Sequence, residues 1–374
     1  MKINKIAVLG FGSFGDPIAE ICSNFCFTSV YIRDQDYVDL LEKKRINERY
    51  YPEHIVPPHI HFSSNIHEVI FEADVIIFAL SGNAFSQIWE QIKENIPQNT
   101  ILVSLCKTII TETLMTTTEM FLQKSTRVAL LTGGSFGFEL KDKTFTAFDL
   151  CSTDKEVALL LKLMFSKDYI HIKTRIGETF LIQASYAGPA KNVLAVSKGI
   201  FDGMNLADNT KFVLLNEMKR ELYIFIEHFV GIYTGLTSEQ REYFSNIRTN
   251  FKNNIFSVDQ KSFLENIQKF SPTKLQTLWF AERTDYELSL FGKSSRNRQF
   301  GEYIGKGRKY EDLKKEFQNH HVTVEGVYSF ESLITISKII GTEVPLIEYA
   351  CQAIHQEISL ELFLDQCIQY IKTK

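Results

Sequence analysis

The sequence has no long apolar run and no paired cysteines. Nowhere in its 374 residues do 18 apolar residues stand together, which argues against a transmembrane helix. The first apolar run, Ile6 to Leu9, is too short for a signal peptide. The six cysteines are scattered and include no Cys-x-x-Cys pair, so neither a disulfide framework nor a zinc site is indicated. We therefore expect a cytoplasmic protein with reduced thiols.

Histidine also lacks the spacing of metal ligands. His59 and His61, and likewise His320 and His321, have no other ligand types nearby at a suitable spacing. We expect no metal site.

Neither sign of charge dominates. The net charge is −4, with 23% charged and 44% hydrophobic residues, an ordinary globular balance. Because no overall basic field exists to hold nucleic acid or an anionic membrane, we expect neither as a partner. An anionic ligand must be bound by local groups. The length of 374 residues favours two domains with a large buried core.

The two halves of the chain differ in their hydrophobic pattern. Short β-rich runs alternate with helix-like segments up to about residue 150, which predicts βαβ units around a parallel sheet. The predicted strands are Lys5–Leu9, Ser29–Ile32, Val75–Ala79, Ile101–Ser104 and Arg127–Leu131. Later segments have apolar residues at helical spacing, and these are Thr179–Phe201, Thr210–Tyr233 and Phe330–Ile340. We predict an α/β domain over residues 1–174 and an all-α domain over 175–374, with a helical insertion near 235–277.

A glycine-rich turn directly follows the first predicted strand. It reads Gly10-Phe11-Gly12-Ser13-Phe14-Gly15 and leads into a helix with Pro17 in its first turn. The spacing meets the G-x-G-x-x-G pattern, and the strand before it and the helix after it make the match specific. Unpaired N–H groups and the helix dipole then face a pyrophosphate. The turn predicts a doubly wound, mostly parallel Rossmann domain that binds a dinucleotide.

The end of the second predicted strand leaves the choice of dinucleotide open. Arg33 and Asp34 stand there, about twenty residues beyond the glycines. The arginine suits the 2′-phosphate of NADP, whereas the aspartate suits the ribose hydroxyls of NAD. Either NAD or NADP is therefore expected as the cofactor.

Several motifs, taken together, resemble the NAD(P)-dependent glycerol-3-phosphate dehydrogenases of bacterial type. Their order and approximate spacing match that family over nearly the whole chain. Besides the glycine turn, the motifs are Ala73-Asp74-Val75-Ile76-Ile77, Ser104-Leu105-Cys106-Lys107, Thr132-Gly133-Gly134-Ser135-Phe136-Gly137, Ala190-Lys191-Asn192-Val193, Asp208-Asn209, Ser295-Arg296-Asn297-Arg298-Gln299-Phe300-Gly301 and Glu325-Gly326-Val327.

The resemblance implies which reaction the protein catalyses and which fold its helical domain has. The reaction is reversible hydride transfer between NAD(P)H and dihydroxyacetone phosphate, which gives sn-glycerol 3-phosphate for glycerophospholipid synthesis. The helical domain is implied to be similar to the C-terminal domain of 6-phosphogluconate dehydrogenase. A small phosphorylated substrate and a homodimer are implied as well, the dimer also because twofold oligomers are common.

The resemblance also implies three catalytic residues, Lys191, Lys107 and Asp285. Negative charge develops on the carbonyl oxygen as hydride reaches the adjacent carbon, and the ammonium of Lys191 can stabilise and protonate that oxygen. Burial would lower the pKa of this amine toward the working range. Asp285 would accept a hydrogen bond from a substrate hydroxyl or orient Lys191.

The remaining site residues are carried over from the same motifs. Those implied to bind the cofactor are Gly10, Gly12, Ser13, Phe14, Gly15, Arg33, Lys107, Gly137, Arg296 and Glu325. Those implied to bind the substrate are Lys107, Gly133, Ser135, Lys191, Asn192, Asp285, Ser295, Arg296 and Asn297. Among them Arg296 offers a planar fork suited to a phosphate. For Ser135, a purely structural turn is an equal alternative.

The chain departs from the family pattern mainly near the implied substrate site. Trp279 to Thr284 carries bulky and charged side chains where the family is rich in glycine, and Gly134 replaces a proline. Leu80-Ser81-Gly82 likewise differs from the family. Two alternatives therefore stay open. One is a related dehydrogenase for another small phosphorylated or carboxylated hydroxy compound, and the other is a catalytically silent dinucleotide-binding sensor.

Overall fold

The chain folds into two compact units. The computed structural model describes residues 2–251, 257–292, 294–319 and 324–374, so His320 and His321 lie outside the described residues. The first unit comprises residues 1–106, 117–184 and 278–281, and the second comprises residues 107–116, 185–277 and 282–374. The predicted boundary between residues 174 and 175, and the predicted insertion near 235–277, stay predictions.

The first unit is built on an 8-stranded sheet with the strand order β12-β11-β10-β7-β6-β1-β2-β5. Neighbouring strands are parallel except β10 and β11, which are antiparallel. The strands are β1 (Lys5–Leu9), β2 (Phe27–Tyr31), β5 (Ile60–Ser63), β6 (Val75–Phe78), β7 (Ile101–Ser104), β10 (Val128–Thr132), β11 (Thr146–Ser152) and β12 (Ile170–Ile176). A small hairpin, β3 (Ile46–Asn47) and β4 (Tyr51–Ile55), lies outside this sheet.

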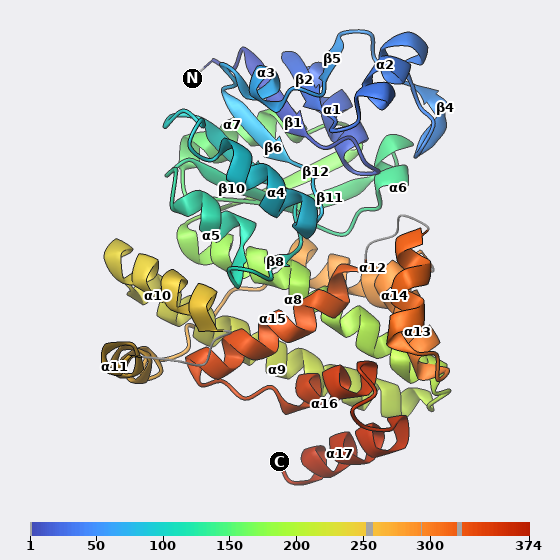
Figure 1. Cartoon of the computed structure of the whole chain (residues 1–374), viewed down its shortest axis with the longest axis vertical. Helices are drawn as coiled ribbons and strands as arrows, with labels where there is room; N and C mark the ends of the chain where they lie inside the picture. Colours follow the sequence, from blue (N-terminus) through green and yellow to red (C-terminus); the bar gives the residue numbers. More distant parts are fainter. Residues whose placement is uncertain (1, 252–256, 293, 320–323) are drawn as a thin grey trace. The chain divides into compact units, whose positions relative to one another are not determined.

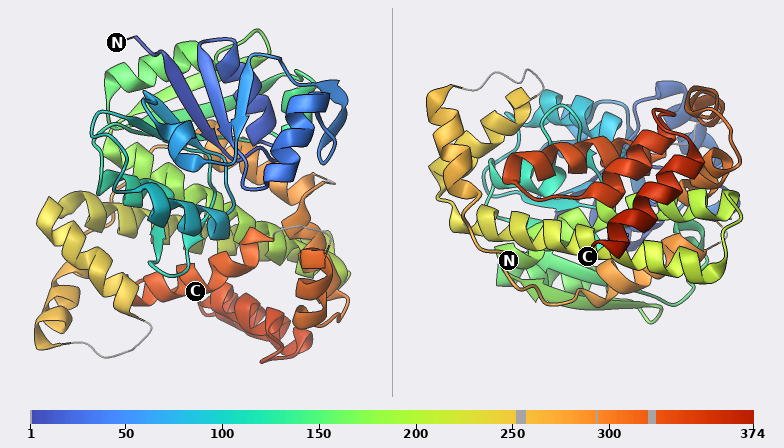
Figure 2. Two further views of the ribbon diagram at one scale, coloured as in Figure 1. Left: turned by 45° about the horizontal axis from the view of Figure 1, so that its top comes forward. Right: turned by 90° about the horizontal axis from the view of Figure 1, so that it is seen from below.

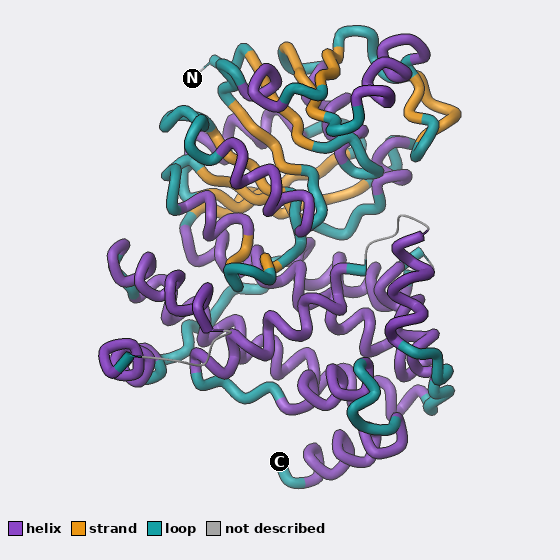
Figure 3. The backbone as a smooth tube through the Cα atoms, viewed as in Figure 1, coloured by secondary structure: helices purple, strands orange, loops and turns teal. Residues whose placement is uncertain are grey.

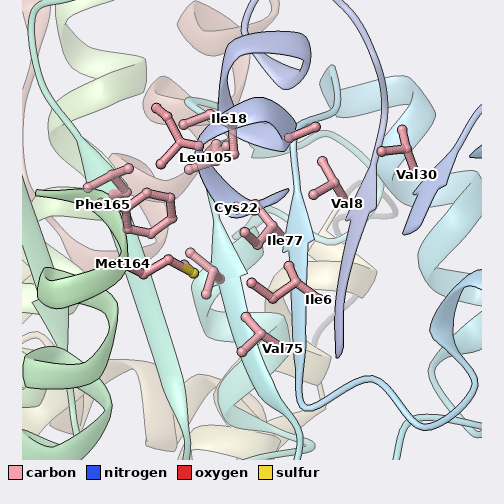
Figure 4. Packing of buried hydrophobic residues seen from close by; sticks show 14 of the residues in the cluster. Ile6, Val8, Ile18, Cys22, Val30, Val75, Ile77, Leu105, Met164 and Phe165 are labelled. Carbon is pink, nitrogen blue, oxygen red and sulfur yellow. The ribbon is translucent and has the colours of Figure 1, made fainter. Parts of the chain in front are cut away.

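Helices cover both faces of the sheet. Cys22 and Ile18 from α1, together with Met164 and Phe165 from α7, pack on Ile6, Val8 and Ile77 of the strands (Figure 4). On the opposite face, Phe78 packs against aromatic rings of α4 and α5. The central strands are buried on both sides, which explains their continuous apolar sequence. The helices of this unit are α1 (Gly15–Ser23), α2 (Gln35–Lys44), α3 (Ile66–Ile70), α4 (Gly82–Ile92), α5 (Thr117–Leu122), α6 (Gly137–Lys141) and α7 (Lys155–Phe165).

The strand order reverses between β1 and β6. From β1 the chain proceeds to β2 and β5 on one side, and from β6 to β7 and β10 on the other (Figure 1). The carboxyl ends of β1 and β6 therefore flank the crevice where doubly wound sheets bind their ligands. All five predicted strands are present, β1 and β7 with the predicted ends and the other three with ends shifted by one or two residues, so the predicted doubly wound α/β fold is confirmed.

In its described residues, the second unit consists of helices and loops besides one hairpin, β8 (Ile109–Ile110) and β9 (Met115–Thr116) (Figure 3). The helices α15, α16 and α17, drawn in red, pack beside the yellow-green α9 (Figure 2). The described helices after β12 are α8 (Glu178–Gly203), α9 (Asp208–Gly235), α10 (Ser238–Asn250), α11 (Val258–Ile267), α12 (Asp285–Phe291), α13 (Arg296–Gly305), α14 (Tyr310–Asn319), α15 (Glu325–Ile340), α16 (Pro345–Ile354) and α17 (Leu360–Lys372), with a π-helix over Trp279–Thr284. The three predicted helical segments lie in α8, α9 and α15, which confirms the predicted helical domain. Among the described residues, no helix combines the length and apolar character needed to cross a membrane.

Glycines bring α8 and α13 unusually close together. A Cβ atom on Gly199 of α8 would lie 2.0 Å from the carbonyl oxygen of Arg298, and one on Gly301 of α13 would lie 2.0 Å from that of Val196. Neither position has room for a larger residue. This close packing places the start of α13 beside the middle of α8, where Asn192 follows Lys191.

Candidate active site

The glycine turn of the first unit joins β1 to α1 at the crevice of the sheet. Gly10 has a φ of +101°, a conformation that side-chain-bearing residues rarely adopt. A Cβ on Gly15 would lie 2.2 Å from the carbonyl oxygen of Gly10. The tight turn and the close approach of helix and strand therefore both depend on glycine.

The turn leaves open space in front of Gly12. The nearest atom to a Cβ built there is the hydroxyl oxygen of Tyr50, 3.9 Å away. In addition, no side chain caps the N-terminus of α1. A diphosphate can thus approach the backbone at Gly12 and meet N–H groups and the positive end of the helix dipole. These features fit NAD or NADP, and Ser13 and Phe14 lie in the same turn.

Buried hydrogen bonds from polar side chains hold the backbone of this turn in place. The side-chain amide of Asn47 donates to the carbonyl of Phe11 at 3.3 Å and to Asp16 at 2.8 Å, and the hydroxyl of Tyr51 donates to the carbonyl of Ser13. Asp16 also accepts from the amine of Lys141 at 2.8 Å. Burial acts to lower the pKa of Lys141, but the attraction of Asp16 and of Glu20 outweighs it and raises this pKa overall. The amine therefore stays charged.

The turn after β10 also belongs to the first unit and contains Gly133, Ser135 and Gly137. A Cβ on Gly137 would lie 2.0 Å from the carbonyl oxygen of Ser13, so this glycine packs directly against the dinucleotide turn. A Cβ on Gly133 would lie 2.5 Å from the carbonyl oxygen of Ala147, which is a structural reason for glycine there. Within the described part of the chain, the hydroxyl of Ser135 donates to the neighbouring carbonyl of Phe136, at 3.4 Å. The implied binding roles of all three stay predictions.

Lys107, Lys191 and Asp285 come together in the second unit. The amine of Lys107 lies 2.6 Å from one carboxylate oxygen of Asp285, and the amine of Lys191 lies 2.9 Å from the other. Lys191 also donates to the hydroxyl of Ser289 at 2.7 Å. The side chain of Asp285 is only 2% exposed and that of Lys191 only 11%. Because α12 begins at Asp285, its first two turns supply both acceptors of the Lys191 amine.

Two local features position Lys107 beside Asp285. The β8–β9 hairpin that follows it is held to the second unit by Arg248, which donates to the carbonyl of Leu114 at 3.1 Å. A Cβ on Gly188 of α8 would lie 2.9 Å from the Cβ of Lys107, so the backbones meet closely there. Asn192 donates to the carbonyl of Lys107 at 3.4 Å.

Burial lowers the pKa of Lys191 to about 8. The negative charge of Asp285 opposes this shift, whereas the positive charge of Lys107 adds to it. An amine with a pKa near 8 exchanges its proton readily close to neutral pH, as a general acid or base requires. The cluster can therefore donate a proton to a carbonyl oxygen or remove one from a hydroxyl.

The start of α13 lies beside this cluster. Ser295 caps the helix by accepting from the N–H of Arg298 at 3.4 Å, and Arg296 is exposed. Asn297 donates to Asn192 at 3.0 Å, and its carbonyl oxygen accepts from the N–H of Gly326 at 3.0 Å. Both ends of the Asn297 amide thus have protein partners. Its main visible contribution is to join α13, α8 and α15.

Glu325 opens α15 next to these residues. Burial raises the pKa of Glu325, while the charges of Arg296, Lys191 and Lys107 pull it down. Its carboxyl group therefore lies within the field of three cations of the site. Whether it contacts the cofactor, as the resemblance implies, stays a prediction.

Sequence reasoning missed Ser289, although a signal for it existed. Residues four apart on a helix share a face, so a hydroxyl four positions after Asp285 points the same way. The segment before Asp285, which differs from the glycine-rich pattern of the family, forms the π-helix Trp279–Thr284. Glu282 in this helix is fully buried. Where the family has glycines, this chain thus leads into Asp285 through a wide helical turn.

Two family models match the chain. The model of the NAD-dependent glycerol-3-phosphate dehydrogenase N-terminus matches residues 5–158. The model of the NAD-dependent glycerol-3-phosphate dehydrogenase C-terminus matches residues 181–240 and 230–365. Together they cover most of both units.

Relatives and solved structures agree with these matches. The glycerol-3-phosphate dehydrogenase (NAD(P)+) of Syntrophotalea carbinolica is 24% identical over 350 residues, which cover 92% of this chain and 91% of that protein. That of Halothermothrix orenii is 28% identical over 230 residues, or 61% of this chain and 67% of that protein. The crystal structure of glycerol-3-phosphate dehydrogenase from Coxiella burnetii has a TM-score of 0.76 at 19% identity and covers 98% of this chain and 99% of its own. The Plasmodium falciparum enzyme gives 0.75 at 20% identity, with 97% and 95% covered. The chain belongs to the NAD-dependent glycerol-3-phosphate dehydrogenase family.

Proposed function

We propose that this chain catalyses the reversible reduction of dihydroxyacetone phosphate to sn-glycerol 3-phosphate with NADH or NADPH. The observation that carries the proposal is the buried amine of Lys191, held between Asp285 and Ser289 and close to the start of α13. A bound reduced nicotinamide supplies the hydride for the carbonyl carbon. The side chains of the second unit then have to bind the phosphate and handle the proton.

Lys191 acts as the proton donor in the direction of reduction. As its pKa is about 8, it is largely protonated at neutral pH and can give its proton to the oxygen on which charge develops. In the reverse direction the neutral amine takes the hydroxyl proton. Asp285 and Ser289 orient the amine, and Lys107 keeps the second oxygen of Asp285 occupied, so that the carboxylate stays in place.

The start of α13 binds the substrate phosphate in this proposal. Arg296 supplies an exposed guanidinium, and the N–H groups of the first helical turn other than that of Arg298 add donors together with a favourable dipole. Asn192 and Asn297 hold this helix start beside Lys191. The phosphate would thus fix the substrate at one end while its carbonyl oxygen meets the amine.

Turnover with purified protein tests the proposal. We expect dihydroxyacetone phosphate to oxidise NADH or NADPH, followed at the nicotinamide absorption band, whereas dihydroxyacetone with free inorganic phosphate gives a far lower rate. Lys191→Ala should lower kcat by about 10²- to 10⁴-fold and leave the affinity for the reduced cofactor nearly unchanged. The matched control is Lys198→Ala, which removes a lysine further along the same helix that pairs with Asp202. Unaltered turnover in Lys191→Ala, or equal losses in both variants, would contradict the assigned role.

Three further proposals accompany this function. The chain acts in the cytoplasm, supplies sn-glycerol 3-phosphate for glycerophospholipid synthesis and forms a homodimer. The relatives' shared activity supports the supply of sn-glycerol 3-phosphate, and the frequency of twofold oligomers supports the homodimer. Light scattering on the eluted protein would measure twice the chain mass for a dimer. Depletion of the protein in the cells that produce it should lower glycerophospholipid synthesis. Added glycerol 3-phosphate should restore this synthesis.

A further inference from the structure

A fully buried arginine of α10 has no part in the proposed chemistry so far. Arg248 is 0% exposed, and burying a charge is costly unless its hydrogen-bond donors are used. It lies near the end of α10, drawn in yellow in Figure 1, within the insertion predicted near residues 235–277. The partners of Arg248 therefore indicate what this helix contributes.

The guanidinium of Arg248 joins the β8–β9 hairpin to α8. One of its terminal nitrogens donates to the carbonyl of Leu114 in the hairpin at 3.1 Å and to the hydroxyl of Tyr186 in α8 at 3.3 Å. The guanidinium carbon also lies 5.4 Å and 4.7 Å from the centres of two aromatic rings, those of Phe229 and Phe244. The cation is thus held on several sides, and it can act as a fixed anchor for the hairpin.

The hairpin depends on such outside contacts for its position. Each of its strands has only two residues, and a two-stranded hairpin of this size is not stable alone. Leu114, in its turn, has a φ of +54°, a conformation that is unfavourable for a residue with a side chain. The hydroxyl of Thr116 donates to that of Ser185 in α8 at 3.2 Å and so holds one strand end. Arg248 holds the turn.

The position of the hairpin determines where Lys107 lies. Lys107 stands just before β8, its Cβ packs closely against Gly188 of α8, and its amine lies 2.6 Å from Asp285. Tyr186, which accepts a hydrogen bond from Arg248, stands shortly before Gly188 on the same helix. One guanidinium therefore ties the turn of the hairpin to the stretch of α8 against which Lys107 packs.

We propose that Arg248 is a positioning residue for the proposed reaction, because it holds the hairpin so that the amine of Lys107 stays on Asp285. The inference rests on the proposed function, and it gives the predicted insertion near 235–277 a role in catalysis. Asp285 pairs with Lys107 through one oxygen and with Lys191 through the other. A displaced hairpin would withdraw the first of these cations and leave the carboxylate free to turn.

Displacement of Lys107 would also change the charge around the Lys191 amine. Burial lowers the pKa of Lys191 to about 8, and the charge of Lys107 adds to this shift, whereas Asp285 and Glu325 oppose it. If the hairpin moves, the repulsion from Lys107 weakens while both carboxylates remain, so the pKa of Lys191 should rise. Loss of Arg248 should therefore move the fall in the reduction rate to a higher pH. A variant that only folds less well would keep the wild-type pH profile.

Two arginines on one helix provide the test. Arg248→Met keeps most of the buried volume but removes the hydrogen bonds to Leu114 and Tyr186. We expect kcat for reduction to fall by about tenfold or more and the midpoint of its pH profile to rise, with the affinity for the reduced cofactor unchanged. The matched control is Arg241→Met, since Arg241 lies over the ring of Tyr233 and donates to the carbonyl of that residue at 2.9 Å. It should change neither kcat nor the midpoint.

Two further variants keep the proposal testable. Arg248→Lys retains the buried charge, for the case that the methionine variant does not fold, but an ammonium lacks the planar fork of the guanidinium. It should lower kcat and raise the midpoint in the same direction. If Arg248 acts through Lys107, Arg248→Met should have a much smaller effect on kcat in a protein that already carries Lys107→Met. Equal fold losses in the two backgrounds would overturn the proposal.

Chemical labelling tests the positioning without turnover. Limited reaction with acetic anhydride, followed by mass spectrometry, gives the rate of acetylation of Lys107 relative to the exposed Lys155. Only a neutral amine reacts, and pairing with Asp285 favours the charged form, so Lys107 should react severalfold faster in Arg248→Met than in wild type or Arg241→Met. An unchanged rate in folded Arg248→Met would overturn the proposal. Absence of turnover in the wild-type protein would instead refute the proposed function, and labelling would still decide whether Arg248 positions Lys107.

Discussion

The buried ion pair behind the glycine turn gives a sharp test of how this turn is held. Lys141 and Asp16 have side chains only 2% and 1% exposed, and their charged atoms lie 2.8 Å apart. Glu20, a second partner of Lys141 at 2.8 Å, is 26% exposed and can turn to water. The perturbation is Lys141→Met, which keeps most of the side-chain volume but leaves the carboxylate of Asp16 buried with Asn47 as its remaining donor.

The expected magnitude follows from burial. Removing one member of a buried ion pair typically costs about 3–5 kcal/mol, because the other charge stays uncompensated. In a unit of this size, such a loss lowers the melting temperature by about 10 °C. If Asp16→Asn is added, no uncompensated charge remains, and the carbonyl oxygen of the introduced amide can still accept from Asn47. The double variant should then recover at least about 2 kcal/mol of the loss, since neutral replacements of buried pairs are often tolerated.

Urea unfolding of wild type, both single variants and the double variant measures this coupling. Because the folded pKa of Lys141 is raised above the ordinary 10.5, its stabilisation is complete below pH 10.5 and is lost only as the pH rises through the higher folded value. The cycle is therefore best measured near neutral pH, where the lysine is charged in both states. A coupling energy below about 0.5 kcal/mol would refute the reasoning, because it would mean that Asp16 and Lys141 do not depend on each other.

Three shorter predictions concern the second unit. Because the pKa of Lys191 is about 8, reduction of dihydroxyacetone phosphate should fall as the pH rises through about 8, while oxidation of glycerol 3-phosphate should rise; parallel pH profiles would contradict this. Ser289→Ala should lower kcat by about tenfold with little change in KM and shift that profile to lower pH, and Ser289→Thr should retain both. Burial raises the pKa of Glu221 to about 7, above the ordinary 4.5, so its favourable contribution is complete below pH 4.5 and is lost as the pH rises through about 7. Glu221→Gln, which can still accept from the N–H groups of Leu346 and Ile347, should therefore be more stable than wild type at pH 8 by up to about 3 kcal/mol, and thermal unfolding at pH 5 and pH 8 tests this.

Most strands that are buried on both faces were predictable from the sequence, because a continuous apolar run is a strong signal. The buried strand β11 was missed, since Asp149 interrupts its apolar run. The edge strand β12 was missed as well, since its residues Ile170–Ile176 alternate with polar and charged side chains and resemble an exposed segment. The hairpins β3–β4 and β8–β9 were missed for a different reason. Strands of two residues, such as β3 and β8, carry no periodicity and form only because the rest of the unit holds their ends together.

The residues of the candidate site could be named from the sequence, but how they pair with one another could not. The motifs name Lys107, Lys191 and Asp285, yet 178 positions separate Lys107 from Asp285 along the chain. Their approach depends on the β8–β9 hairpin belonging to the second unit and on the close contact at Gly188, neither of which has a local sequence signal. Pairing of both lysines with one carboxylate is therefore a property of the packed helices.

The role of Asp16, in the first turn of α1, cannot be judged from its helix position alone, because its partner Lys141 is distant in the sequence. An aspartate in the first turn of a helix is favourable for the helix dipole, but Asp16 also lies where a diphosphate should bind, and two anions repel each other. The conflict is resolved by Lys141, 125 positions later, and by Asn47 from the hairpin, which direct the carboxylate into the protein. The same hairpin carries Arg49 to Asp34, the second acidic residue near the dinucleotide. In this chain the carboxylates of Asp16 and Asp34 are thus paired with cations from later segments, which lowers the repulsion that a ligand rich in phosphate would meet at the glycine turn and at the end of β2.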